Sequence, residues 1–347
     1  MLVDSVPEQR AETAPAPPTR RAIRAVGLLV SVSVLLLVAV ASIAIGAKEL
    51  SMGQVWHGVF EGTGTYADVV VDERLSRTAL GLLAGAALGL AGTVLQALTR
   101  NPLADPGLLG INAGASAAVV TALTYFGVTS LSGYVWFAFL GAAAVGALVW
   151  FLGGSRNATP VRLALAGTAI SAALFGYVQA VMIMDEAALA KMRFWTVGSL
   201  SSATDDTIRQ VLPFIAVGTL LSLALARPLN AVAMGDDTAR ALGAHLGRTR
   251  ALSMLAATVL CGAATAACGP IVFVGLMVPH VVRSFTGPDL RWIMPYAAVL
   301  SPVLLLGSDV IGRVVARPSE VQVGIITAII GGPVFIFLVR RRRTAQL

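Results

Sequence analysis

The chain has 347 residues, of which 56% are hydrophobic and only 12% are charged, and its mean hydropathy is +0.81. Soluble domains carry about 25% charged residues, so this composition excludes a soluble fold and makes lipid the solvent for most of the chain. The net charge of +7 would suit nucleic acid. The basic residues, however, occupy short gaps between apolar runs rather than one soluble face, so no nucleic-acid partner is expected.

The first 24 residues are polar and include a proline-rich run followed by arginines. This composition predicts a disordered cytoplasmic tail over 1–24. The stretch Ala25–Gly46 carries no charge and predicts the first membrane crossing. A cleaved signal peptide is the alternative, but its apolar region would be only ~7–15 residues long.

The remaining crossings are predicted from charge-free runs, each compared with the roughly 20 residues that one crossing needs. Gly107–Ser155 is long enough for two crossings and breaks at Thr129–Gly133. Ala251–Val282 breaks at Cys268-Gly269-Pro270 and holds one full crossing and a short one, over about 271–285. The other runs are Thr78–Thr99, Leu163–Met184, Gln210–Ala226, Trp292–Ser308 and Val321–Val339.

The sequence therefore predicts an all-α polytopic membrane protein with about ten transmembrane helices. These form one domain over 25–343, followed by a short tail over 344–347. An even number of crossings puts both termini on one side of the membrane. Loops on that side hold roughly two-thirds of the lysines and arginines, and the positive-inside rule makes that side the cytoplasm. The expected location is the bacterial inner membrane, surrounded by lipid.

No catalytic constellation stands out in the sequence. The three histidines are far apart and lack cysteine or carboxylate partners at ligand spacing, so neither a metal site nor a bound cofactor is expected. There is no Gly-x-x-x-x-Gly-Lys-Ser/Thr run, so any ATP hydrolysis would belong to another chain. The same absence of paired catalytic groups argues against an intramembrane enzyme.

Ionisable residues within the predicted crossings are scarce. Asp309 and Arg313, four residues apart at the end of the ninth crossing, are the exceptions. They form either a local pair near the interface or a functional group. An ion-coupled secondary carrier is the main alternative to an ATP-driven transporter, but such carriers usually keep a charge near the midplane, and the scarcity weighs against one.

The longest predicted cytoplasmic loop, 227–250, contains a segment suited to a short helix. Gly235-Asp236-Asp237 can start it, since acids favour the positive end of the helix dipole. The helix is expected to continue over Thr238–Leu246, with Ala239, Leu242 and Leu246 on roughly one face. Such a helix either inserts into a groove of a soluble partner or rests on lipid, and the residues alone favour neither.

Five ordered motifs resemble the permease family of type II ABC importers, which take up ferric siderophores, haem and cobalamin. Together they are spread over nearly all of the chain after residue 70. The motifs are RNPLADPGLLG (Arg100–Gly110), WTVGSL (Trp195–Leu200), GDDTARALG (Gly235–Gly243), GPIVFVGLMVPHVVR (Gly269–Arg283) and GIITAIIGGPVFIFLVRR (Gly324–Arg341).

The resemblance implies a transporter of two permease subunits, identical or related, with two cytoplasmic ATPases and an extracytoplasmic substrate-binding protein. ATP and Mg would bind to the ATPases, whose closure moves the coupling helices and rocks the crossings. A ferric siderophore is the expected substrate, with haem or cobalamin as the alternative. The residues that this resemblance assigns to ATPase coupling are Gly235, Asp236, Asp237, Arg240, Leu242 and Gly243.

The resemblance also implies that external arginines dock the binding protein through its carboxylates. By position these are Arg74, Arg77 and Arg313, each of which could instead be an interfacial anchor. The sequence departs from the family pattern at Ser76, where proline is usual, and at Val321-Gln322, where Leu-Pro is usual. The loop Asp185–Asp206, with Phe194 and Trp195, is the candidate outer gate.

Overall fold

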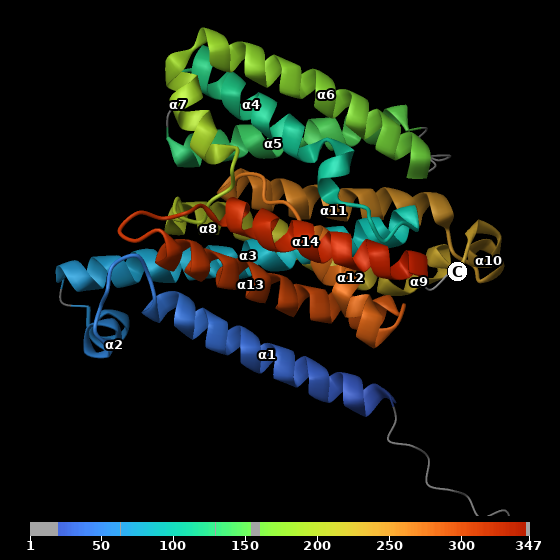
Figure 1. The fold of residues 1–347 in the computed structure, drawn as a ribbon. Helices are drawn as coiled ribbons and strands as arrows, with labels where there is room; N and C mark the ends of the chain where they lie inside the picture. The colour runs from blue at the N-terminus through green and yellow to red at the C-terminus, as the bar shows by residue number, and fades with distance from the viewer. Residues whose placement is uncertain (1–19, 63, 129, 154–159, 345–347) are drawn as a thin grey trace, which may run out of the picture.

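The computed structural model describes residues 20–62, 64–128, 130–153 and 160–344, and within these every regular element is helical. The long helices run roughly side by side (Figure 1). In chain order the elements are α1 (Arg20–Ala44), α2 (Met52–Phe60), α3 (Tyr66–Thr99), the 3-10 helix η1 (Pro106–Leu109), α4 (Ile111–Tyr125), α5 (Leu131–Leu152), α6 (Pro160–Met184), α7 (Glu186–Trp195), α8 (Asp205–Ala224), α9 (Ala226–Ala233), α10 (Asp236–Ala241), α11 (Leu246–Cys268), α12 (Val274–Thr286), α13 (Leu290–Val315) and α14 (Val323–Thr344).

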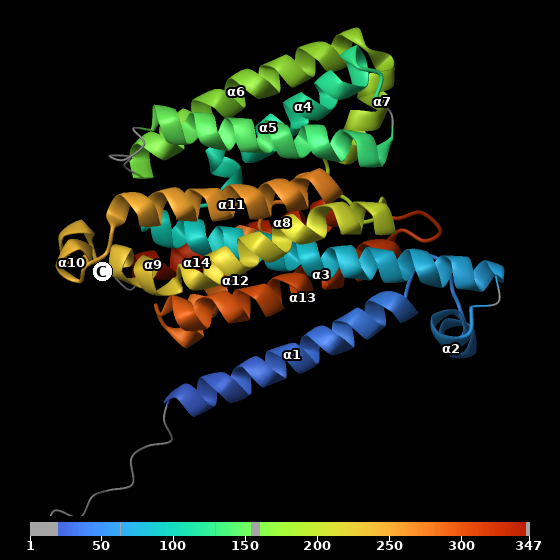
Figure 2. The ribbon, with the colours of Figure 1, turned by 180° about the vertical axis from the view of Figure 1, so that it is seen from behind.

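The helices stack in layers. α4, α5 and α6 lie along one side of the bundle and α1 lies alone on the opposite side, packed on α13, as both views show (Figures 1 and 2). α3 and α11 occupy the centre, and 78% of the apolar window of each is buried. In α1 that share is 6%, which suits a helix whose outer surface meets lipid.

Close helix packing in the centre depends on glycines of α3. A Cβ added to Gly85 would lie 2.6 Å from Pro302 Cα on α13. A Cβ on Gly92 would clash with the backbone of Gly275 on α12. Small residues at such positions let helix backbones approach closely, which is how helices associate where lipid removes the hydrophobic driving force.

Both described ends of the chain lie at the same end of the bundle, beside α10, whereas α2 and α7 lie at the opposite end (Figure 1). We call these the α10 end and the α2 end. This arrangement agrees with an even number of crossings. The assignment of the α10 end to the cytoplasm stays a prediction.

The predicted helix breaks are confirmed. α4 and α5 are separate helices, and α11 ends at Cys268, directly before the predicted Gly269-Pro270 break. Among the described residues, seven helices are long and apolar enough to cross a membrane, namely α1, α3, α5, α6, α8, α11 and α13. α4 and the Val323–Phe337 part of α14 are apolar but shorter, and α12 has 13 residues. The count of ten crossings therefore stays a prediction.

Several boundaries differ from the sequence prediction. α1 begins at Arg20, so the helix includes part of the predicted 1–24 tail; residues 1–19 and 345–347 lie outside the described residues. α3 begins at Tyr66, because Thr65 caps it and charged residues continue the helix beyond the apolar run. α2 and α7 were not predicted, since each is too short to appear as a charge-free run.

Candidate functional site

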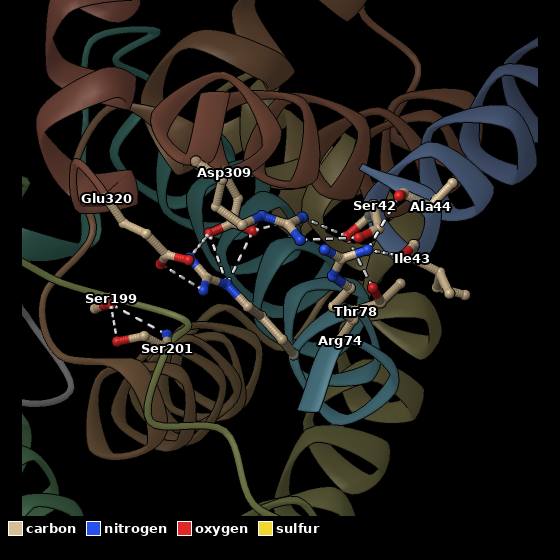
Figure 3. Close-up of polar contacts among 11 residues, drawn as sticks. Ser42, Ile43, Ala44, Arg74, Thr78, Ser199, Ser201, Asp309 and Glu320 are labelled. Carbon is tan, nitrogen blue, oxygen red and sulfur yellow. Dashed lines mark hydrogen bonds and ion pairs between the residues drawn. The ribbon is translucent and has the colours of Figure 1, made fainter. Parts of the chain in front are cut away.

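A group of charged side chains from three elements meets at the α2 end (Figure 3). Arg77 of α3 donates from Nε to both Asp309 oxygens at 3.1 Å and from Nη2 to Oδ1 at 2.7 Å. Arg77 Nη1 lies 2.7 Å from Glu320 Oε2, and Arg313 Nη2 lies 3.0 Å from Asp309 Oδ2. We call Arg77, Asp309, Arg313 and Glu320 the charge cluster.

The charge cluster is almost completely buried. The exposed fraction of the side chain is 0% for Asp309, 2% for Arg313 and 10% for Arg77. Glu320, at 33%, is the most exposed member. Two guanidinium groups face two carboxylates, so the four formal charges cancel and their mutual attraction offsets the desolvation cost that each buried ion would otherwise carry alone.

Arg74, which lies beside the charge cluster, and Arg313, which belongs to it, also hold the end of α1. Arg74 donates to the carbonyls of Ile43 and Ala44, both at 3.0 Å. Arg313 Nη1 donates to the Ser42 carbonyl at 2.9 Å, and the Ser42 and Thr78 hydroxyls lie 2.8 Å apart. The last carbonyls of a helix have no intrahelical partner, so these contacts satisfy the α1 carboxyl end and fix it to α3 and α13.

The three arginines predicted to dock a partner are therefore not surface residues. Their relative exposures are 5% for Arg74, 9% for Arg77 and 1% for Arg313. They are buried because they pair with Asp309 and with α1, which sequence spacing does not reveal, and their docking role stays a prediction. All three nevertheless line a cavity of about 540 Å³, together with Lys48, Tyr66, Glu73, Glu320 and the loop Ser201–Thr204.

The candidate gate loop joins three of the sequence motifs at the α2 end. Ser199 N donates to the Cys268 carbonyl at 2.8 Å, and Gly324 N donates to the Gly198 carbonyl at 3.1 Å. A Cβ on Gly269 would clash with the Trp195 carbonyl. The loop after α7 thus packs against the α11–α12 break and the start of α14. Trp195 is partly buried, whereas the side chain of Phe194 lies outside the described residues.

The predicted coupling segment lies at the α10 end. Gly235 and Gly243 flank α10 with φ of 115° and 78°, backbone conformations that favour glycine. Leu242 is 62% exposed. Asp237 is fully exposed and pairs with Arg240 at 3.1 Å. These side chains are free to meet a partner.

Asp236 has a different role from its neighbour Asp237. It pairs with Arg100, which follows α3, and with Arg250 of α11 at 2.8 Å. Burial alone would raise the pKa of Asp236, but hydrogen bonds from the two arginines outweigh it and hold the pKa below its usual value. Arg100 Nε also donates to the Val232 carbonyl at 2.8 Å. Asp236 thus ties α10 to the two central helices.

The predicted helix face in this segment was partly wrong. α10 ends at Ala241, and Leu246 begins α11. Ala239 and Leu246 are buried against Val232, whereas Leu242 points outward. The positive φ of Gly243 turns the chain, so the helical spacing assumed for Ala239, Leu242 and Leu246 does not hold across it.

Two residues of these sites, Arg100 and Glu320, were not predicted from the sequence, and neither was the pairing of Asp309 with Arg77. The signal available was a lone acid and lone bases inside otherwise apolar helices, which must pair to be buried. Within the described part of the chain, His, Cys, Asp and Glu side chains form no group of three that could hold a metal ion.

Comparison with known proteins gives consistent matches. Residues 34–341 match the family described as the FecCD transport family. The chain is 47% identical to the ferric enterobactin transport system permease protein FepD of Escherichia coli K12, covering 93% of this chain and 96% of FepD. It is 38% identical to the probable siderophore transport system permease protein YfiZ of Bacillus subtilis 168, covering 90% of this chain and 96% of YfiZ.

A solved structure shares the arrangement of helices. It is assigned to the metal-chelate type of ABC transporter, in an inward-facing conformation. The TM-score is 0.81 at 26% sequence identity, with 91% of this chain and 99% of that chain covered.

Proposed function

This chain belongs to the FecCD transport family, the permeases of type II ABC importers, and from that membership we propose that it imports a ferric siderophore. It is a multi-pass permease of the bacterial inner membrane. The observation that carries the substrate proposal is the 47% identity to a ferric enterobactin permease over 93% of the chain. Haem and cobalamin, which other members of this family carry, are the alternative substrates.

The proposed transporter contains two permease subunits, two separate ATPases and an extracytoplasmic binding protein. The permease supplies the pathway and performs no covalent chemistry. ATP and Mg bind to the ATPases. Ten crossings with both termini in the cytoplasm place the α10 end against the ATPases, an arrangement supported by the two chain ends lying there together (Figure 1).

The coupling segment would transmit movement of the ATPase to the membrane helices. Asp237, Arg240 and Leu242 offer an exposed mixed polar and apolar surface to an ATPase groove. Asp236, paired with Arg100 and Arg250, would pass a displacement of α10 on to α3 and α11. Gly235 and Gly243 are the proposed hinges, since each takes a positive φ.

At the α2 end, the cavity lined by Arg74, Arg77 and Arg313 is the proposed docking place for a carboxylate of the binding protein. The cavity gives an acidic side chain a route to the otherwise buried guanidinium groups. Glu320 already holds Arg77 at 2.7 Å, so an incoming carboxylate would compete with it. The loop with Phe194 and Trp195 remains the proposed outer gate.

The substrate proposal is tested in a bacterium that lacks its own ferric enterobactin permease, supplied with this chain and its cognate ATPase and binding protein. Restored uptake of radiolabelled ferric enterobactin, unaffected by excess haem or cobalamin, is expected. Uptake of haem or cobalamin in its place would refute the siderophore assignment and leave the permease assignment intact.

A further inference from the structure

A second cavity lies at the α10 end, and the transport cycle described above assigns no ligand to it, although Leu242 and Gly243 of the coupling segment form part of its wall. Its volume is about 610 Å³. It is formed by the end of α8, by α9, by the loop after α10 and by the start of α11. The lining residues are Leu221, Ala224, Leu225, Arg227, Pro228, Ala231, Leu242, Gly243, Ala244, His245, Arg248, Thr249 and Leu252.

The cavity has a basic rim without any acid. Arg227, His245 and Arg248 line it, and no aspartate or glutamate does. Among the described contacts, neither Arg227 nor Arg248 has an ion pair or a side-chain hydrogen bond. The nearby acids are already used, since Asp236 pairs with Arg100 and Arg250 and Asp237 pairs with Arg240. The cavity therefore lacks a counter-charge from the described part of the chain.

The opposite wall is apolar and belongs to two long apolar helices. Leu221 and Leu252 line the cavity and lie in α8 and α11, helices apolar and long enough to cross a membrane. Exposed apolar side chains follow on both helices: Leu220, next to Leu221 on α8, is 69% exposed, and Leu255, about one turn after Leu252 on α11, is 52% exposed. The basic rim and the apolar wall thus meet at one helix–helix groove.

We propose that this cavity binds an anionic phospholipid, with the phosphate between Arg227 and Arg248 and an acyl chain along the α8–α11 groove. Guanidinium groups suit phosphate because they donate several hydrogen bonds in a fixed planar arrangement. Basic pockets between membrane helices on the cytoplasmic side are suited to anionic headgroups. An apolar wall on two helices long enough to cross a membrane suits an acyl chain, so a lipid is the occupant that uses both the rim and the wall.

The test measures lipid binding to the purified full-length permease by native mass spectrometry. Phosphatidylglycerol and phosphatidylcholine with identical acyl chains serve as probes. Wild type should prefer phosphatidylglycerol. The double variant Arg227→Gln with Arg248→Gln should lose that preference, by about fivefold in affinity for each arginine removed. Arg227→Lys with Arg248→Lys should retain part of it, because the charge remains.

The matched control is Arg209→Gln. Arg209 is exposed and lies on α8, whose other end forms part of the cavity, but it stands at the opposite end of the bundle, so its loss should leave lipid preference unchanged. Unchanged thermal unfolding of all variants would show that the fold is intact. Glycerol 3-phosphate, which has the headgroup chemistry without an acyl chain, should not displace the lipid at equal concentration.

Three results would overturn the proposal. The first is equal binding of the two lipids by wild type. The second is undiminished phosphatidylglycerol preference in the Arg227→Gln with Arg248→Gln variant. The third is displacement of the lipid by the assembled ATPase subunits or by glycerol 3-phosphate, which would make the motor or a free phosphate the occupant. None of these measurements uses the transported substrate, so the outcome is independent of whether that substrate is a siderophore.

Discussion

Arg77 and Asp309 are 232 residues apart in the chain and form a bidentate ion pair, with Arg77 Nη2 2.7 Å from Asp309 Oδ1. This pair joins α3 to α13 at the α2 end. Arg313 and Glu320 complete the charge cluster, and Arg74 extends it to the end of α1. The end of the bundle that we propose receives the binding protein is thus fixed by internal charges.

Replacement of Asp309 should destabilise the permease strongly. Asp309→Asn leaves two buried guanidinium groups with only the partly exposed Glu320 as counter-charge, and the expected loss is about 3–5 kcal/mol of unfolding free energy. Glu320→Gln is the control, because Glu320 is one-third exposed and should cost only about 0–1 kcal/mol. Thermal unfolding in detergent measures both. Equal destabilisation by the two variants would show that the burial of Asp309 does not determine the loss of unfolding free energy.

Glu320→Gln should also change docking. If the binding protein inserts a carboxylate against Arg77, removing the internal competitor should strengthen docking by about two- to fivefold, the equivalent of one partly exposed ion pair. Surface plasmon resonance with the substrate-loaded binding protein measures this. Glu49→Gln, which frees the exposed Arg317 instead, should have no effect. Weaker docking of the Glu320 variant would contradict the competition between the two carboxylates.

Leu242→Asp should uncouple ATP hydrolysis by the partner ATPase from the permease. Leu242 is 62% exposed, so a charge there costs the permease fold little but should prevent insertion into an apolar ATPase groove. Stimulation of ATP hydrolysis by the loaded binding protein should be lost, while expression and thermal unfolding stay normal. Leu242→Met keeps the apolar surface and should keep the stimulation. Normal stimulation in the aspartate variant would remove Leu242 from the coupling surface.

Glycine packing between α3 and α12 can be tested with a matched pair of substitutions. Gly92→Ala places a methyl group against the Gly275 backbone, and overpacking of this kind costs about 1–3 kcal/mol. Gly307→Ala on α13 meets no atom within 4 Å, so its stability should stay unchanged or rise slightly. The comparison is made by thermal unfolding. A tolerated Gly92→Ala would mean that α12 can shift away without cost.

The sequence predicted the parts of the fold that depend on local composition. Apolar run length located the membrane helices, and Gly269-Pro270 located the α11–α12 break, because glycine and proline act on the backbone where they stand. The start of the short helix α10 was predicted for the same reason, through Gly235 and the acids after it; its coupling role stays a prediction.

Tertiary pairing could not be predicted in the same way. The charge-free run within α3 begins only after Arg77, although the helix itself begins at Tyr66. The run could not show the earlier start, because the partners of the charged residues, Asp309 and the carbonyls of α1, come close only in the folded chain. The same limit applies to Asp236, which looked like its neighbour Asp237 and differs from it only through Arg100 and Arg250.

A separate ATPase should drive transport through this permease. The direct measurement is uptake of radiolabelled ferric enterobactin into proteoliposomes that contain the chain, its ATPase and its binding protein. Uptake should require ATP on the side of the α10 end and should not respond to a proton or sodium gradient alone. Accumulation driven by an ion gradient without ATP would contradict the account.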